Sequence, residues 1–187
     1  FETYHRILDE AITELKEREF KDVLFTDEKE IIEKQFVSDC IIDTDLSVLF
    51  PQDYINNISE RIRLYRELDN LEDEAELTDF TEKLIDRFGP LPPQTQELMN
   101  VVRLRWEAVK LGIEKIIIKN NKMVNFFVSD QDSEFYRSAK FSRILTYLQN
   151  HPKKIRMKEE NERLSMTIDH VESVNQAIET LEAIDKK

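Results

Sequence analysis

The chain has 187 residues, a formal net charge of −12 and a pI near 4.8. Contacts to phosphate need clustered Lys and Arg, so we expect a protein partner with basic patches and no direct contact with nucleic acid. The single cysteine, Cys40, excludes an internal disulfide and a cysteine-rich metal site, and it fits a reducing, cytoplasmic setting. No apolar run is long enough to span a bilayer, so we expect no membrane contact.

The first 15 residues have the pattern of an amphipathic helix, and residues 16–35 that follow are mostly charged or polar. An apolar stripe must pack on something, so this helix belongs to a preceding domain or acts as an arm. Because the chain begins with Phe1 and not Met, we expect it to be a piece of a longer protein. The apolar positions of this helix are Tyr4, Ile7, Leu8, Ala11, Ile12 and Leu15.

From Cys40 the hydrophobic pattern changes to a period of two, which predicts a half-buried strand that ends at Pro51. Its inward positions are Ile42, Thr44, Leu46, Val48 and Phe50.

A helix is expected next, because Asn57 with Glu60 three residues later is typical of a capped helix start. The spacing predicts a buried face made by Ile58, Ile62, Tyr65, Leu68 and Leu71, with Arg61, Arg63 and Arg66 exposed.

Two further helices are predicted on either side of a rigid corner. Gly89 can close the first of them, Pro90 cannot continue it, and the pair Pro92-Pro93 fixes the backbone before the second, which Gly112 ends. The buried positions are Leu77, Phe80, Thr81, Leu84, Ile85 and Phe88 in the first helix, and Leu98, Val101, Leu104, Ala108 and Leu111 in the second.

The remainder of the chain predicts two hairpin-helix units. Asn120-Asn121 tolerates positive φ and joins two strands, and a helix follows at about 133–149. A second hairpin turns at Glu160-Asn161, and Asp169 with Glu172 is expected to cap the last helix. The fold class is therefore α+β: a helical half with one strand, followed by two hairpin-helix units whose antiparallel strands pack on helices. The second hairpin places Ile155 and Met157 opposite Leu164, Met166 and Ile168.

No residues converge in a catalytic pattern, so we expect no enzyme activity, no bound cofactor and no metal in this chain. His5, His151 and His170 are scattered along the sequence without carboxylates or cysteines at ligand spacing. Gly89 and Gly112 both fall at helix ends, which leaves no glycine-rich phosphate loop.

Charged residues expected at the surface are more informative about function than the candidate catalytic residues. The stretch from Glu67 to Glu82 holds eight acidic residues and no basic one. Directly after it, Asp86 and Arg87 lie in the last turn of a helix beside the proline corner, where their freedom is small, and fixed opposite charges favour specific recognition. The simpler interpretation is that Arg87 satisfies the last carbonyls of its own helix while Asp86 pairs locally.

Four stretches of the chain, in the same order, resemble the C-terminal (TRCF) domain of bacterial transcription-repair coupling factor. The resemblance covers nearly the whole chain. The stretches are Phe1 to Ala11; Phe50 to Ile55 with Arg61, Leu64, Tyr65 and Arg66; Leu84 to Pro92; and Leu111 to Ile116.

The resemblance implies a parent protein of the helicase superfamily, an ATP-dependent double-stranded DNA translocase that displaces stalled RNA polymerase and recruits UvrA for nucleotide excision repair. ATP and Mg would be bound by its motor domains, and DNA by the parent as well. Residues 1–15 would be the connecting helix from a motor domain, 16–35 a charged linker, and 36–187 a C-terminal regulatory domain.

In the family this domain folds back onto an N-terminal UvrB-like module, masks its UvrA-binding surface and keeps the protein inactive. The resemblance therefore implies an autoinhibitory interface at Glu82, Lys83, Asp86 and Arg87. A glutamate is common in the family three residues before the aspartate, whereas this chain has Lys83 there with Glu82 beside it.

Two other functions remain open from the residues alone. The first is a free-standing acidic interaction module, in which the stretch from Glu67 to Glu82 occupies a basic groove of the partner. The second is a hydrolase in which Asp43, Asp45 and another carboxylate bind a metal.

Overall fold

The computed structural model describes residues 35–130, 132–160 and 163–186. The expected helix at 1–15 and nearly all of the expected linker at 16–35 lie outside the described residues, so that division of the chain stays a prediction. Gln35–Lys187 form one compact unit. Its elements are β1 (Ile41–Thr44), α2 (Ile58–Asp69), α3 (Glu74–Phe88), α4 (Pro93–Lys110), β2 (Ile113–Lys119), β3 (Lys122–Phe127), the 3-10 helix η1 (Glu134–Arg137), α5 (Ala139–Asn150), β4 (Ile155–Glu160), β5 (Arg163–Asp169) and α6 (Val174–Asp185).

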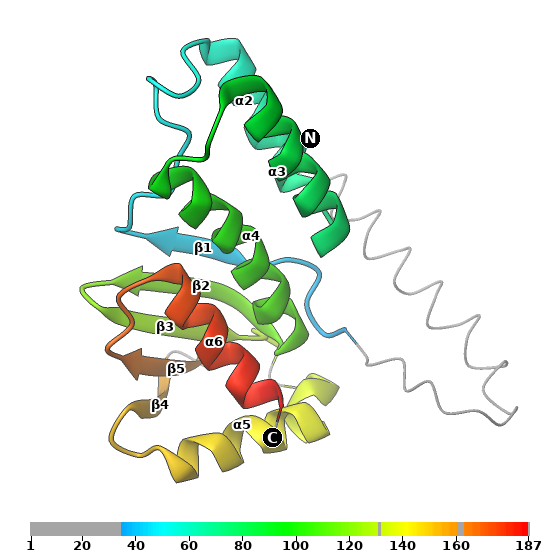
Figure 1. The fold of residues 1–187 in the computed structure, drawn as a ribbon. Helices are drawn as coiled ribbons and strands as arrows, with labels where there is room; N and C mark the ends of the chain where they lie inside the picture. Colours follow the sequence, from blue (N-terminus) through cyan, green and yellow to red (C-terminus); the bar gives the residue numbers. More distant parts are fainter. Residues whose placement is uncertain (1–34, 131, 161–162, 187) are drawn as a thin grey trace, which may run out of the picture. The chain divides into compact units, whose positions relative to one another are not determined.

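The strands form one mixed sheet of five in the order β1-β2-β3-β5-β4, which confirms the α+β class (Figure 1). The two predicted hairpins, β2-β3 and β4-β5, join through antiparallel pairing of β3 with β5, in which Asn125 faces Met166. β1 adds to the edge in parallel, with Ile42 opposite Ile116. Asn120 and Asn121 take positive φ values of 52° and 59° at the first hairpin turn, as predicted.

The predicted strand from Cys40 to Phe50 is wrong in its length, since β1 has only four residues. Its last pair is Thr44 with Ile118, and the amide of Asp45 then donates to the Ile118 carbonyl at 3.2 Å. β2 ends one residue further on, at Lys119, so no neighbouring backbone remains to continue the ladder. Beyond that point Phe50 leaves the sheet and packs among the helices.

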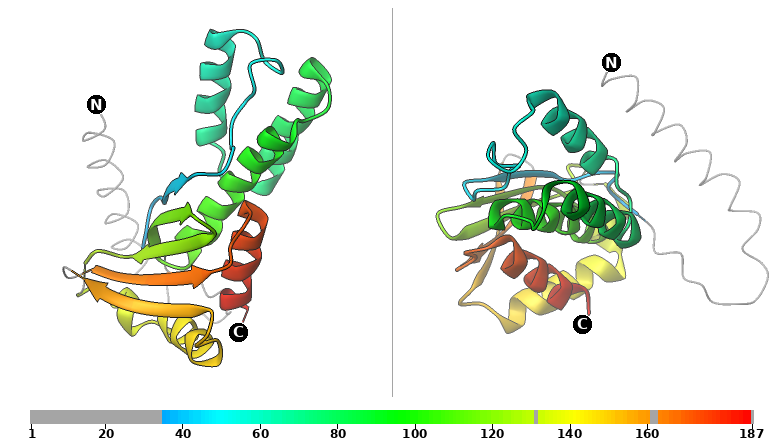
Figure 2. Two further views of the ribbon diagram at one scale, coloured as in Figure 1. Left: turned by 90° about the vertical axis from the view of Figure 1, so that its left-hand side faces the viewer. Right: turned by 45° about the horizontal axis from the view of Figure 1, so that its top comes forward.

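Two hydrophobic cores share one helix. The first lies between the sheet and the helices α4, α5 and α6, and the second lies between α2, α3 and α4. α4 and α6 lie side by side over one face of the sheet, and the N-terminal half of α4 continues to α2 and α3 (Figures 1 and 2). Along α4, Leu98, Met99 and Val102 face the second core, whereas Leu104, Ala108 and the following Leu111 face the first.

Gly112 ends α4 as predicted, with φ of 70°. A Cβ at this position would collide with the ring of Phe135, so both the backbone angle and the space require glycine here.

The predicted helix at 133–149 is divided into η1 and α5. Ser138 interrupts it because its hydroxyl accepts a hydrogen bond from the Phe141 amide at 3.2 Å and so caps a new helix. Ser133 caps η1 in the same way.

The predicted cap of the last helix is also wrong. Asp169 ends β5 and accepts a hydrogen bond from Arg156 at 2.7 Å, so it is not available to a helix. Ser173 caps α6 by accepting from the Gln176 amide at 3.2 Å. No helix in the described part of the chain is long and apolar enough to cross a membrane.

Candidate interaction groove between α2 and α3

α2 begins as predicted, with the side chain of Asn57 accepting a hydrogen bond from the Glu60 amide at 3.0 Å. Its predicted buried face is right only in part: Leu68 is buried and Leu71 packs half-buried against the helical core, but Leu64, which was not predicted, is also buried. Ile58 and Ile62 are 65% and 48% exposed. Apolar residues stand on two neighbouring sides of this helix, so periodicity alone did not decide which side meets α3 and α4.

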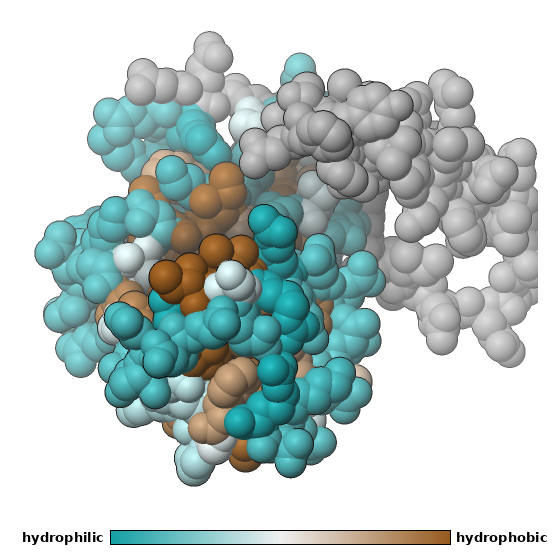
Figure 3. Space-filling model, turned by 90° about the horizontal axis from the view of Figure 1, so that it is seen from above, coloured by the Kyte–Doolittle hydropathy of each residue, from teal (hydrophilic) through white to brown (hydrophobic). Residues whose placement is uncertain are grey.

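Figure 3 views the molecule from above relative to Figure 1 and shows a group of hydrophobic side chains at the surface, surrounded by hydrophilic ones.

α3 starts at the cap residue Asp73 and ends at Gly89, whose φ is 86°. Leu77, Phe80 and Leu84 are buried as predicted, whereas Ile85 is 45% exposed.

The corner after α3 is fixed by hydrogen bonds. The Tyr54 hydroxyl donates to the Gly89 carbonyl at 2.9 Å, and the Gly89 amide donates to the Ile85 carbonyl at 2.9 Å. Pro92 then stands at the N-cap of α4 and Pro93 is its first residue. The expected rigid corner is present.

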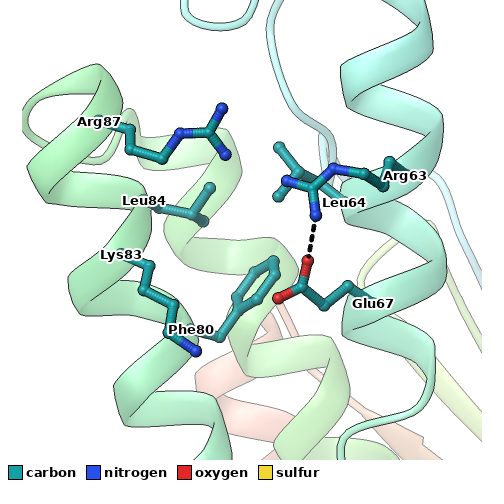
Figure 4. A pocket seen from close by; sticks show the side chains of 7 residues that line it. All are labelled: Arg63, Leu64, Glu67, Phe80, Lys83, Leu84 and Arg87. Atoms are coloured by element: carbon teal, nitrogen blue, oxygen red, sulfur yellow. Dashed lines mark hydrogen bonds and ion pairs between the residues drawn. The ribbon is translucent and has the colours of Figure 1, made fainter.

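A groove of about 210 Å³ runs between α2 and α3 (Figure 4). Three buried residues, Leu64, Phe80 and Leu84, form its apolar floor. This volume is below the ~300–1,000 Å³ of small-molecule pockets, so the groove suits a side chain of another protein segment better than a free ligand. The charged residues on its rim are Arg63 and Glu67 from α2 and Lys83 and Arg87 from α3.

Glu60 links the two helices. It accepts from Arg63 at 2.9 Å, and Arg87 of α3 reaches across to the same carboxylate at 2.8 Å. The hydrogen bond from Arg63, followed by the one from Arg87, lowers the pKa of Glu60 from 4.5 to about 2. Arg63 also contacts Glu67 at 3.0 Å.

The simpler interpretation is wrong: Arg87 bonds to Glu60 of α2, and Asp86 has no ion pair within the described residues. The Arg87 guanidinium pairs with α2 and lies 4.9 Å from the ring centroid of the adjacent Phe88. These two contacts hold the group in place at the mouth of the groove.

The four predicted interface residues fall on two sides of α3, and all four are exposed. Lys83 and Arg87 line the groove, whereas Glu82 and Asp86, also four residues apart, lie on a neighbouring side. Within the described residues, the side chains of Glu82, Lys83 and Asp86 have no hydrogen bond or ion pair.

The sequence analysis did not identify the charged residues that α2 contributes at the groove. The residues concerned are Glu60, Arg63 and Glu67, and their spacing of three and four residues was a usable signal because it predicts one charged helix side.

Much of the acidic stretch is occupied by contacts inside the domain. Asp69 pairs with Arg105 at 2.6 Å and Glu74 with Arg103 at 2.6 Å. Glu67 pairs with Arg63, as described above. The negative surface open to a basic partner is therefore smaller than the sequence indicates, which weakens the hypothesis of an acidic interaction module.

The two aspartates of the hydrolase hypothesis each have a partner. Lys119 contacts the Asp43 carboxylate at 2.7 Å, and the Asn120 amide donates to Asp45 at 3.0 Å. Across the residues that the structure describes, no group of three or more His, Cys, Asp or Glu side chains is close enough to hold a metal ion.

The remaining candidate residues are separate. His151 stacks on Tyr147 with ring centroids 4.2 Å apart, and His170 follows β5 with φ of 63°. Cys40 is buried, and burial raises the pKa of its thiol to about 12, which makes it unreactive. His5 lies outside the described residues.

Comparison with known proteins identifies the family. The model of the TRCF domain matches residues 44–138, just over half of the chain. The chain belongs to the TRCF domain family. A transcription-repair-coupling factor from Rickettsia typhi is 30% identical over 161 residues, which are 86% of this chain and 13% of that protein. The one from Escherichia coli is 36% identical over 75 residues, 40% of this chain and 6% of that protein.

The TRCF domain described here thus spans about an eighth of the length of such relatives. Its fold is that of a crystal structure of the C-terminal domain of transcription-repair coupling factor, with a TM-score of 0.61 at 17% identity, covering 79% of this chain and 94% of that one. The resemblance inferred from the sequence is confirmed.

Proposed function

We propose that this TRCF domain is a non-catalytic, autoinhibitory domain of a transcription-repair coupling factor. The parent would be a cytoplasmic ATP-dependent translocase of double-stranded DNA that displaces stalled RNA polymerase and recruits UvrA, with ATP and Mg bound by its motor domains. The domain would bind the UvrB-like module of the same protein and mask its UvrA-binding surface. The observation that carries the proposal is the exposed charged end of α3 beside a rigid corner, where Glu60 fixes Arg87 and where Lys83 and Asp86 have no ion pair within the described residues.

The rigidity of this end supports a role in binding. Arg87 is held by Glu60, and the backbone after it by the Tyr54 hydroxyl and the two prolines that begin α4. A surface that is ordered before binding loses little conformational entropy when its partner arrives. The Asp86 side chain is exposed and has no hydrogen bond or ion pair within the described residues, so it is available to a partner.

The expected strength of the contact suits a switch. Exposed ion pairs contribute about 0.2–1 kcal/mol each, so a few of them hold a closed state by only a few kcal/mol. Polymerase or DNA can release such a state by binding the open form more tightly by a similar amount. A regulatory contact needs this modest strength, because a much stronger interface would not open.

The test is the double substitution Asp86→Ala with Arg87→Ala in the full-length protein. We expect the closed state to lose about 1–2 kcal/mol, a roughly 5- to 30-fold drop in the ratio of closed to open molecules. UvrA affinity and ATPase or translocation activity should rise in the absence of polymerase.

The matched control is Asp53→Ala with Arg66→Ala, which removes one exposed charge of each sign from residues that do not line the groove and have no ion pair within the described residues. Affinity and turnover should stay at the level of the unmodified protein in this control. If the Asp86 and Arg87 variant behaves like the control, the proposed function is wrong.

A further inference from the structure

The rim of the groove carries a surplus of positive charge. Arg63 is balanced by Glu60 and Glu67, and Arg87 shares Glu60 with it. Lys83, on the same rim, has no ion pair within the described residues. The local surplus is therefore one cation, and it stands at Lys83 (Figure 4).

The floor of the groove makes this surplus effective. Leu64, Phe80 and Leu84 are no more than 3% exposed, so the charges stand above apolar atoms. Charges beside apolar protein interact more strongly than charges fully surrounded by water, because the effective dielectric is lower. A side chain that docks here meets both an apolar surface and a cation.

The net charge of the chain, −12, would by itself favour a basic partner. At the groove this expectation does not hold, because dissolved salt screens the charges of distant residues. At physiological ionic strength the Debye length is about 8 Å, so most of the remote carboxylates are screened and the neighbouring groups dominate. Of the carboxylates at the groove, Glu67 on the rim and Glu60 are already engaged by arginines. The acidic residues that flank Lys83 on α3, Asp79, Glu82 and Asp86, do not line the groove.

We propose that the groove receives a carboxylate side chain of the UvrB-like module, which pairs with Lys83 and Arg63 while a neighbouring apolar residue covers the floor. This inference rests on the proposed function and names the chemistry of its partner. It assigns a contact to α2 as well as to α3. It also makes Lys83 the residue that determines which charge the partner must carry.

The test compares substitutions of Lys83 in the full-length protein. Lys83→Ala should lower the ratio of closed to open molecules about two- to fivefold, and Lys83→Glu roughly tenfold, because attraction is replaced by repulsion of similar size. Lys83→Arg should leave the ratio unchanged. The ratio is measured by energy transfer between dyes on this domain and on the UvrB-like module, alongside UvrA affinity without polymerase.

Two controls accompany this series. Arg66→Glu makes the same kind of charge reversal at an exposed position of α2 outside the groove, and it should not change the ratio. The thermal midpoint of the Lys83→Glu variant should match that of the unmodified protein, because Lys83 has no partner to lose within the described residues.

The outcomes separate this inference from the function on which it rests. If Lys83→Glu favours the closed state, the partner group is basic and the inference is overturned. If Lys83→Glu behaves like Arg66→Glu while the Asp86 and Arg87 double variant still opens the protein, the proposed autoinhibitory function stands and the carboxylate inference fails. If the double variant also has no effect, the proposed function fails.

Discussion

At the scale of single residues, Glu60 is the best-defined electrostatic group of this domain. Two guanidiniums, from Arg63 and Arg87, bind one carboxylate that lies at the junction of α2 and α3. The pKa of Glu60 falls to about 2 for this reason. Glu60 therefore keeps its negative charge throughout the cellular pH range.

The lowered pKa predicts a pH dependence of stability. Below its ordinary pKa of 4.5 the unfolded chain binds a proton at Glu60 that the folded chain does not, so folding stability decreases as pH falls from about 5 to about 2. Glu60→Gln should reduce this dependence, measured as the change in urea midpoint between pH 6 and pH 3. It should not alter the dependence between pH 6 and pH 8.

Glu82→Gln is the matched control, because Glu82 is exposed and has no ion pair within the described residues. Equal loss of stability on acidification in the Glu60 and Glu82 variants would contradict the assignment of Glu60 as the linked group.

At the scale of elements, the sequence predicted those whose signals were local. The corner at Gly89 and the hairpin turn at Asn120-Asn121 followed from backbone preferences that few other residues share. The cap at Asn57 also followed from chain-local chemistry.

Long-range choices were not predictable in the same way. β1 ends at Thr44 because β2, which lies much later in the chain, ends at Lys119 and has no further backbone to pair with. Asp169 was expected to cap a helix, but Arg156 on the neighbouring strand engages it. The groove depends on Arg87 crossing to Glu60, a contact that neither helix reveals alone.

The buried side of α2 gives a test at this scale. Leu64→Ala should cost about 2–5 kcal/mol of unfolding free energy, because it leaves a cavity against α3 and α4. Ile62→Ala should change the unfolding free energy by no more than about 0.5 kcal/mol, since Ile62 is 48% exposed. Urea denaturation of the two variants measures both values. Equal costs would mean that the side predicted from periodicity is buried after all.

At the scale of the whole described domain, α4 connects a sheet-based core to a smaller helical core. The groove belongs to the smaller one, which has no strands of its own. Helical pairs of this size are marginal when isolated, because most helix stability in proteins comes from packing. The groove therefore keeps its shape only while α4 is anchored on the sheet.

This dependence predicts one cooperative unfolding transition. Trp106, the single tryptophan, packs against the smaller core from α4, so its fluorescence reports that core while far-UV circular dichroism reports the whole domain. The two urea transitions should coincide. Phe80→Ala removes a buried ring from the smaller core and should lower the unfolding free energy by about 3–5 kcal/mol. Both midpoints should then fall together. If only the fluorescence transition shifts, the two cores unfold independently, and α4 does not transmit stability from the sheet to the groove.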